Sequence, residues 1–208
     1  MKFWLASSDL NLIDTLNPLG VFSGVVTNPA VVAEAKRDRV GLFRDIVSRV
    51  DVAWYQLLDD TEDKMLADAE TMLGINPLKM RIKVPATRTG LKVISRLSKQ
   101  GLPIMATCVP TRAWLLFAIA AGARVIAPYS SMLQKRGLTS KAEEVVKMQE
   151  LLDRQAPHVE LLTGIYDVTE IPFYAAHGVR SCFIWGKDAD AYLTQSLADE
   201  AARTFGGY

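Results

Sequence analysis

The sequence has few of the residues that metal sites, catalytic triads and disulfide frameworks require. It contains only two cysteines and two histidines among 208 residues. Cys108 and Cys182 lie far apart in apolar segments, and no Cys/His spacing resembles a zinc site. With His158 and His177 as the only histidines, a metal cluster or a histidine-based triad is disfavoured. We therefore expect no metal site and no structural disulfide.

A marked excess of charge of one sign is absent as well. The chain carries 24 basic and 23 acidic side chains, a formal net charge of +1. This balance argues against nucleic acid or an anionic membrane as a partner. The longest apolar run, residues 113–123, is about half of the roughly 20 residues that a transmembrane helix needs. The first nine residues turn polar too early for a secretory signal, so we expect a cytoplasmic protein.

What the chain does have is apolar material in a regular arrangement. Half of its residues are hydrophobic, which is enough for one sizeable core, while the length is too small for two generous domains. No low-complexity linker interrupts the sequence. We therefore expect one domain over residues 1–208.

Short apolar runs alternate with longer segments of helical period. The expected strands are 2–6, 20–26, 52–57, 80–84, 103–109, 124–127, 159–163 and 181–185. The expected helices are 9–16, 29–50 (in one or two pieces), 61–73, 87–99, 111–121, 140–155, 168–177 and a last stretch, 188–205. Near-continuous apolar strands alternating with helices indicate a parallel α/β sheet. Eight such units predict a single (β/α)8 (TIM) barrel with a C-terminal helical extension, and a doubly wound open sheet is the alternative.

Residues that start and end helices agree with this division. Candidate N-caps are Ser8-Asp9, Thr61 and Ser140, and candidate C-terminal glycines are Gly101, Gly122 and Gly178. The side-chain oxygens of the first group can accept hydrogen bonds from exposed backbone N–H groups. Glycine is favoured where a helix ends in a left-handed residue.

Lys83 is the foremost candidate for chemistry. It lies within the apolar strand Ile82-Lys83-Val84-Pro85, where an ammonium group is costly unless it is paired or deprotonated. The neutral amine of a lysine in a dry site can attack a carbonyl and form a Schiff base. The alternatives are an outward lysine that reaches solvent between the helices, or one paired with an acid for structure.

Other strand ends carry polar but uncharged residues, namely Asn28, Gln56, Thr107 and Tyr129. Active sites of such barrels gather at the C-terminal ends of the strands. These side chains could orient the hydroxyl groups of a substrate and hold a water molecule. Each alone is also explained as a cap or turn residue, and Asn28 could cap a helix that begins with Pro29.

Four segments give a more specific indication. They are Val25-Val26-Thr27-Asn28-Pro29, Ile82-Lys83-Val84-Pro85-Ala86-Thr87, Ala106-Thr107-Cys108-Val109 and Ile126-Ala127-Pro128-Tyr129. In order and spacing they resemble the transaldolase family, in particular its small subgroup with fructose-6-phosphate aldolase and the short transaldolases. The resemblance implies a (β/α)8 barrel without cofactor that makes or cleaves the bond beside a ketose carbonyl through a lysine Schiff base. It also implies a homo-oligomer, because family members form pentamers that pair into decamers.

The resemblance assigns roles residue by residue. Lys83 matches the nucleophile, and the residues that match the holders of the catalytic water and the proton relay are Gln56, Thr107 and Tyr129. The candidate substrate-binding residues are Thr27, Asn28, Gly164 and Trp185. The implied partner is a small carbonyl compound or a sugar, with or without phosphate.

Three departures from the family pattern bear on activity. The first is Ala6, which stands where the family has an aspartate whose acid–base help is typically worth about 10² to 10⁴ in rate. Tyr129 could replace that carboxylate through a water molecule. An alternative function follows: a catalytically impaired paralogue that binds or senses a carbonyl metabolite.

The second departure concerns phosphate. Met132 and Gly164 stand where the family has an arginine and a serine. Lys135, Arg136 and Lys187 could supply replacement charge, or could be solvated loop residues. Because a flexible lysine does not reproduce the fork of an arginine, an unphosphorylated substrate is an open alternative.

The third departure is Arg81. It lies two residues before Lys83 and is therefore expected on the same face of the strand. Either its charge lowers the pKa of Lys83, or it pairs with an acid at the bottom of the barrel, for which Asp51 is the candidate.

Overall fold

In the computed structural model, which describes residues 1–206, eight parallel strands close into a barrel in chain order. The strands are β1 (Lys2–Ala6), β2 (Phe22–Val26), β3 (Ala53–Gln56), β4 (Met80–Pro85), β5 (Ile104–Val109), β6 (Val125–Pro128), β7 (Glu160–Ile165) and β8 (Ser181–Trp185). Pairing of β1 with β8 closes the ring. The predicted (β/α)8 barrel is confirmed, and the open-sheet alternative is wrong.

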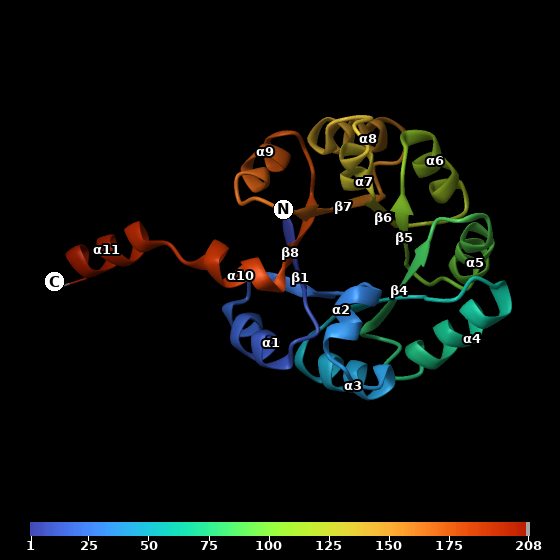
Figure 1. The fold of residues 1–208 in the computed structure, drawn as a ribbon, viewed down its shortest axis with the longest axis horizontal. Helices are drawn as coiled ribbons and strands as arrows, with labels where there is room; N and C mark the ends of the chain where they lie inside the picture. The colour runs from blue at the N-terminus through green and yellow to red at the C-terminus, as the bar shows by residue number, and fades with distance from the viewer. Residues whose placement is uncertain (207–208) are drawn as a thin grey trace.

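Helices surround this ring, as Figure 1 shows. They are α1 (Leu10–Leu16), the 3-10 turn η1 (Asn17–Leu19), α2 (Pro29–Glu34), α3 (Arg39–Arg49), α4 (Glu62–Leu73), α5 (Arg88–Lys99), α6 (Arg112–Ala120), α7 (Ser130–Lys135), α8 (Lys141–Gln155), α9 (Glu170–Ala176), α10 (Gly186–Leu193) and α11 (Ser196–Phe205). None of the helices within residues 1–206 combines the length and apolar character needed to cross a membrane.

Alternate residues of each strand face the interior of the barrel, which large side chains fill. Trp4 and Trp54 meet there edge to face, with ring centroids 6.3 Å apart, and Met105 and Leu162 complete a buried cluster with them. Because successive side chains of a strand point to opposite faces, the residues between them join a larger apolar layer under the helices. On β4 this alternation sends Ile82 and Val84 outward to that layer.

The predicted helix signals are mostly confirmed. The Asp9 carboxylate accepts hydrogen bonds from two backbone N–H groups of α1, and the Ser140 hydroxyl accepts one from α8. Thr61 is the N-cap residue of α4, as predicted, but its side chain makes no capping hydrogen bond. The three helix-terminal glycines, Gly101, Gly122 and Gly178, all have positive φ.

Two short elements differ from the sequence-based expectation. The helix α7 follows β6 directly and was not predicted, since its six residues are too few to show a helical period. The stretch 188–205 is two helices, α10 and α11, separated at Thr194 and Gln195.

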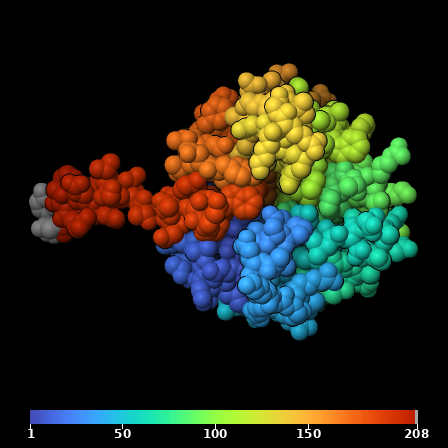
Figure 2. All heavy atoms as spheres, in the orientation of Figure 1, coloured from blue at the N-terminus to red at the C-terminus, as the bar shows by residue number. Residues whose placement is uncertain are grey.

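The helix α11 stands away from the barrel. None of its side chains is buried, and its Leu197 and Phe205 are 70% and 68% exposed. In Figures 1 and 2 it forms an arm that projects from the body of the molecule. The predicted C-terminal extension is therefore present, and its apolar residues have no partner within the described part of this chain.

Candidate active site

Lys83 lies inside the barrel, opposite Gln56 of β3 in the strand register. Only 6% of it is exposed. Its Nζ donates a 2.6 Å hydrogen bond to the backbone carbonyl of Thr27 at the end of β2, and no carboxylate of the described residues forms an ion pair with it. The two alternatives, an outward lysine and a lysine paired with an acid, are therefore both wrong.

Burial determines the protonation of this amine. Removal from water lowers the pKa of Lys83 to about 8, because the charged form loses its hydration. The nearby Cys108 thiol acts weakly in the opposite direction. At pH 7 a pKa of 8 leaves about a tenth of the amines neutral, against fewer than about one in a thousand for an ordinary lysine.

A cavity of about 280 Å³ opens in front of Lys83 at the C-terminal ends of the strands. The sequence-predicted residues that line it are Asn28, Gln56, Lys83, Thr107, Tyr129, Gly164 and Trp185. These residues come from seven different strand ends or the turns after them, and closure of the barrel brings them together. The cavity has the position and the polar lining expected of an active site in this fold.

Thr27 is the predicted site residue that the cavity lining does not include. Its hydroxyl donates to the carbonyl of Trp54, and its own carbonyl holds the Lys83 amine. The predicted cap at Asn28 is confirmed, because its Oδ1 accepts from the backbone N–H of Val31 at the start of α2, and the residue also lines the cavity. Thr27 therefore positions the lysine through its backbone.

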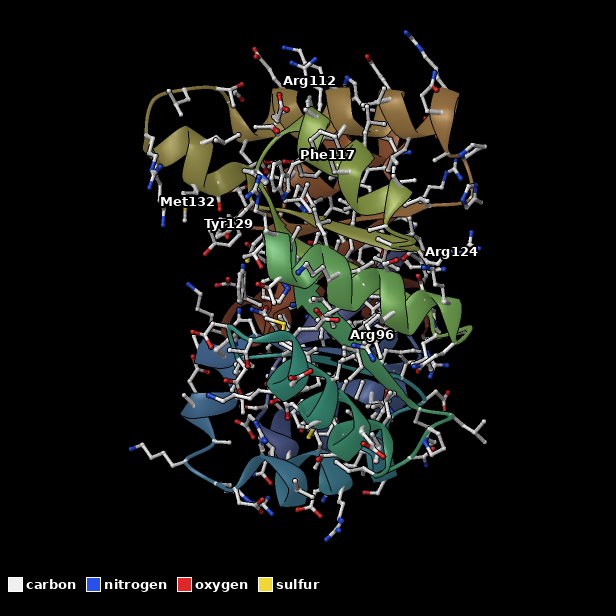
Figure 3. All side chains as sticks on the ribbon, turned by 90° about the vertical axis from the view of Figure 1, so that its right-hand side faces the viewer. Arg96, Arg112, Phe117, Arg124, Tyr129 and Met132 are labelled. Atoms are coloured by element: carbon white, nitrogen blue, oxygen red, sulfur yellow. The ribbon has the colours of Figure 1, made fainter. Side chains whose placement is uncertain are left out.

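Tyr129 stands between β6 and α7, and 43% of it is exposed. Figure 3 shows it beside Met132 at one end of the barrel, with Arg124, which precedes β6, at the other end. Met132 is not among the residues that line the cavity. Of the basic residues considered as replacement charge, Lys135 lines the cavity, Lys187 lines a neighbouring hollow, and Arg136 lines neither.

Ala6 ends β1 in register with Trp185. Beside it lies a second hollow, of about 550 Å³, that shares Asn28 and Trp185 with the first cavity. Asp9 and Glu34 line this second hollow, whereas no described residue that lines the first cavity carries a carboxylate. Asp9 already accepts two backbone hydrogen bonds as a helix cap.

Both predictions for Arg81 are wrong. Its guanidinium donates to the backbone carbonyls of Met80 and Pro77, and no ion pair within residues 1–206 joins it to Asp51. It is also absent from the causes of the lowered pKa of Lys83. Backbone carbonyl groups close to it in sequence, at the bottom of the barrel, therefore accept the hydrogen bonds of the arginine.

Several residues that line the cavity were missed, among them Lys141, Cys108, Tyr166 and Phe183. Lys141 lines the cavity with its ammonium 2.6 Å from Glu170 and 4.5 Å from the ring centre of Tyr166. A lysine in the first turn of a helix is unfavourable to the helix dipole, and this mismatch after the Ser140 cap was the available signal. Cys108, also in the lining, has a φ of 58° next to an irregularity in the β5–β6 pairing, which the sequence does not reveal.

Comparison with known proteins agrees with this geometry. Residues 50–172 match the family model described as transaldolase/fructose-6-phosphate aldolase. A probable transaldolase of Streptococcus agalactiae is 28% identical over 207 residues, 99% of this chain and 95% of that protein. A probable transaldolase of Streptococcus pyogenes is 30% identical over 165 residues, 79% of this chain and 76% of that protein.

Among solved structures, a cube-shaped protein cage designed by fusing symmetric oligomeric domains matches with a TM-score of 0.61 at 9% identity. The match covers 88% of this chain and 62% of the cage chain, and it bears on the fold alone. The family match takes in the strand that carries Lys83, the end of β5 and the end of β6. This chain belongs to the transaldolase/fructose-6-phosphate aldolase family.

Proposed function

We propose that this protein is a class I aldolase or transaldolase-like enzyme, a lyase or a transferase that works through a Schiff base on Lys83. Its family makes it an enzyme that forms or breaks carbon–carbon bonds. The observation that carries the finer proposal is an amine in the wall of a cavity, buried by the barrel and without an acid partner among residues 1–206. A neutral amine in that position is what condensation with a ketone requires.

In the proposed reaction the amine of Lys83 attacks the ketone carbon, and the carbinolamine loses water to give an iminium ion. The iminium ion withdraws electrons from the carbon next to it. The bond from that carbon to the following carbon, which bears a hydroxyl group, therefore breaks. The hydroxyl proton passes to a base, an aldehyde departs, and the electron pair stays on the enzyme as an enamine. In cleavage the enamine is protonated and hydrolysed, and in transfer it attacks a second aldehyde.

The polar residues of the cavity fit the remaining tasks. Water must leave and re-enter at the Schiff-base carbon, and Gln56 and Thr107 lie on the strands that flank Lys83. Tyr129 is the phenol available as a proton carrier at the cavity. Asn28 presents an amide to the hydroxyl groups of the bound sugar fragment. No cofactor takes part in these steps.

Borohydride reduction with dihydroxyacetone tests the proposal. Mass spectrometry of the intact protein and its peptides should find one reduced adduct, located on Lys83. Lys83→Met should remove the adduct, whereas Lys135→Met, which changes another lysine of the same cavity, should retain it. If none of the hydroxyketone donors tested gives a reduced adduct, the proposal is contradicted.

A second candidate function is favoured by Ala6 and by the lack of a carboxylate among the described residues that line the cavity. In this alternative the protein binds or senses a carbonyl metabolite with little turnover. Ala6→Asp should then raise aldol cleavage at least tenfold while leaving the amount of trapped adduct unchanged. Ordinary enzyme rates in the unaltered protein would exclude this alternative.

The proposal includes a homo-oligomer, of pentameric or decameric size as the family resemblance implies. The projecting helix α11 supports it, because its exposed Leu197 and Phe205 are available to pack against another copy.

A further inference from the structure

The cavity in front of Lys83 has two halves of different chemistry. The side formed by β2 to β5 carries the amide and hydroxyl groups of Asn28, Gln56 and Thr107. The opposite side, formed by β7, β8 and the turn after β7, carries three aromatic rings, Tyr166, Phe183 and Trp185, together with the Thr163 hydroxyl and the Lys141 ammonium. A substrate whose carbonyl reaches Lys83 therefore directs its other end to one of two very different surfaces.

The three rings form a connected wall. The centroids of Phe183 and Trp185 are 5.1 Å apart in an edge-to-face arrangement, and those of Tyr166 and Trp185 are 5.9 Å apart. The Phe183 ring also occupies the space beside Gly164. A Cβ atom on Gly164 would lie 2.6 Å from a ring carbon, so no side chain can extend from position 164 while the ring is in place.

Three lysines line the cavity, and two of them are already engaged: Lys83 is the proposed nucleophile and Lys141 has an acid partner. Lys141 is buried and its ammonium is neutralised by Glu170 at 2.6 Å. The same carboxylate oxygen accepts the backbone N–H of Tyr166, which fixes it behind the aromatic wall. A phosphate next to Lys141 would have to displace or face this carboxylate and lose its own hydration. Lys135, the third lysine of the lining, is exposed, so water screens its charge.

We infer that this cavity takes an uncharged carbonyl substrate whose end remote from the reacting carbon is an aromatic or aliphatic group packed against Tyr166, Phe183 and Trp185, in place of a phosphate. This inference deepens the proposed function and depends on it for the covalent step. The new bond joins the enamine carbon of a dihydroxyacetone unit to the carbon of such an aldehyde, and the aldehyde oxygen takes up a proton. Benzaldehyde is the simplest probe of this class.

Kinetics with dihydroxyacetone as donor compare the two kinds of acceptor. Benzaldehyde should have a kcat/KM at least tenfold above that of glyceraldehyde 3-phosphate. Tyr166→Ala removes a half-exposed ring and should lower kcat/KM for benzaldehyde about two- to tenfold, with unphosphorylated glyceraldehyde changed less. A kcat/KM for glyceraldehyde 3-phosphate that equals or exceeds that for benzaldehyde overturns the inference. The contradiction is most direct if Lys135→Ala then lowers kcat/KM for the phosphorylated acceptor alone.

A binding measurement tests the inference independently of turnover. Benzyl alcohol cannot form a Schiff base, so ligand-observed NMR with the intact protein reports the aromatic wall alone. We expect saturation transfer from the protein to benzyl alcohol, a decrease in Tyr166→Ala, and no competition by 10-fold higher inorganic phosphate. Displacement of benzyl alcohol by phosphate, or no binding at all, overturns the inference. Failure of borohydride trapping with positive benzyl alcohol binding would instead contradict only the proposed function.

Discussion

At the scale of single residues, the reactivity of Lys83 depends on what is missing around it. A lysine whose charge is matched by a carboxylate stays protonated, because the charged form is then stabilised. Lys83 instead donates to a backbone carbonyl and is screened from water. Lys141 of the same cavity has an acid partner: burial lowers its pKa, and hydrogen bonding and charge interaction with Glu170 offset only part of that lowering.

The rate of adduct formation should therefore rise with pH. With a pKa of about 8 for Lys83, the neutral amine increases roughly tenfold from pH 6 to 7 and levels off above about pH 9. Pre-steady-state trapping with dihydroxyacetone at constant ionic strength measures this profile. A midpoint above pH 10 would show that burial does not activate the amine. Tyr129→Phe should leave the midpoint in place, since that phenol is not a cause of the shift.

Lys83→Met should stabilise the fold near neutral pH. The folded-state pKa, about 8, lies below the ordinary value of 10.5, so below pH 8 the native state holds a buried charge at a cost of about 3 kcal/mol. The cost fades as pH rises from 8 to 10.5, because the folded state releases its proton first. Urea unfolding of both proteins at pH 7 and pH 10 should show the difference shrink. If Lys83→Met is less stable than the parent protein at both pH 7 and pH 10, the buried charge does not carry this cost.

At the scale of secondary structure elements, the helix starts differ in what holds them. Asp9 accepts hydrogen bonds from the N–H groups of Asn11 and Leu12, whereas Thr61 makes no side-chain bond at the start of α4. A side-chain cap satisfies a backbone donor that would otherwise lack an intrahelical partner. The two positions therefore form a matched pair.

Asp9→Ala should destabilise the protein by about 1 kcal/mol, and Thr61→Ala should change its stability by less than about 0.5 kcal/mol. Chemical denaturation of the two variants under the same conditions measures both effects. If both variants lose the same free energy of unfolding, the hydrogen bonds of Asp9 contribute nothing beyond local helix preference.

At the scale of the whole molecule, the barrel accounts for the site but leaves the arm α11 without a partner. Exposed Leu197 and Phe205 on a helix that buries nothing are costly to leave in water. Packing against another copy would remove that cost and also anchor the helix.

Replacing Leu197 and Phe205 with serine should lower the molar mass measured by light scattering, because the apolar contact between copies is lost. Glu200→Gln changes a charged residue of the same helix and serves as the control. The molar mass of this variant should equal that of the parent protein. Since α11 lies outside the barrel, borohydride trapping at Lys83 should be retained in the serine variant. A monomeric parent protein at working concentration would contradict the oligomer altogether.

Much of this architecture was predictable because its causes are local. The alternation of apolar strands with helical segments predicted all eight strands within a few residues, and the setting of Lys83 in an apolar strand predicted a buried amine. The short helix α7 was not predictable, because six residues carry too little periodicity. Arg81 was misjudged because the backbone carbonyls that accept its hydrogen bonds are invisible in a sequence.

The sequence by itself determined the barrel, the candidate nucleophile and the polar residues at the strand ends, since these follow from periodicity and from residue type. Only the tertiary structure decided how the cavity is divided. The packing of Phe183 against Gly164 and the pairing of Lys141 with Glu170 join residues of different elements. Such contacts depend on which strands become neighbours when the barrel closes, and no local pattern along the chain records them.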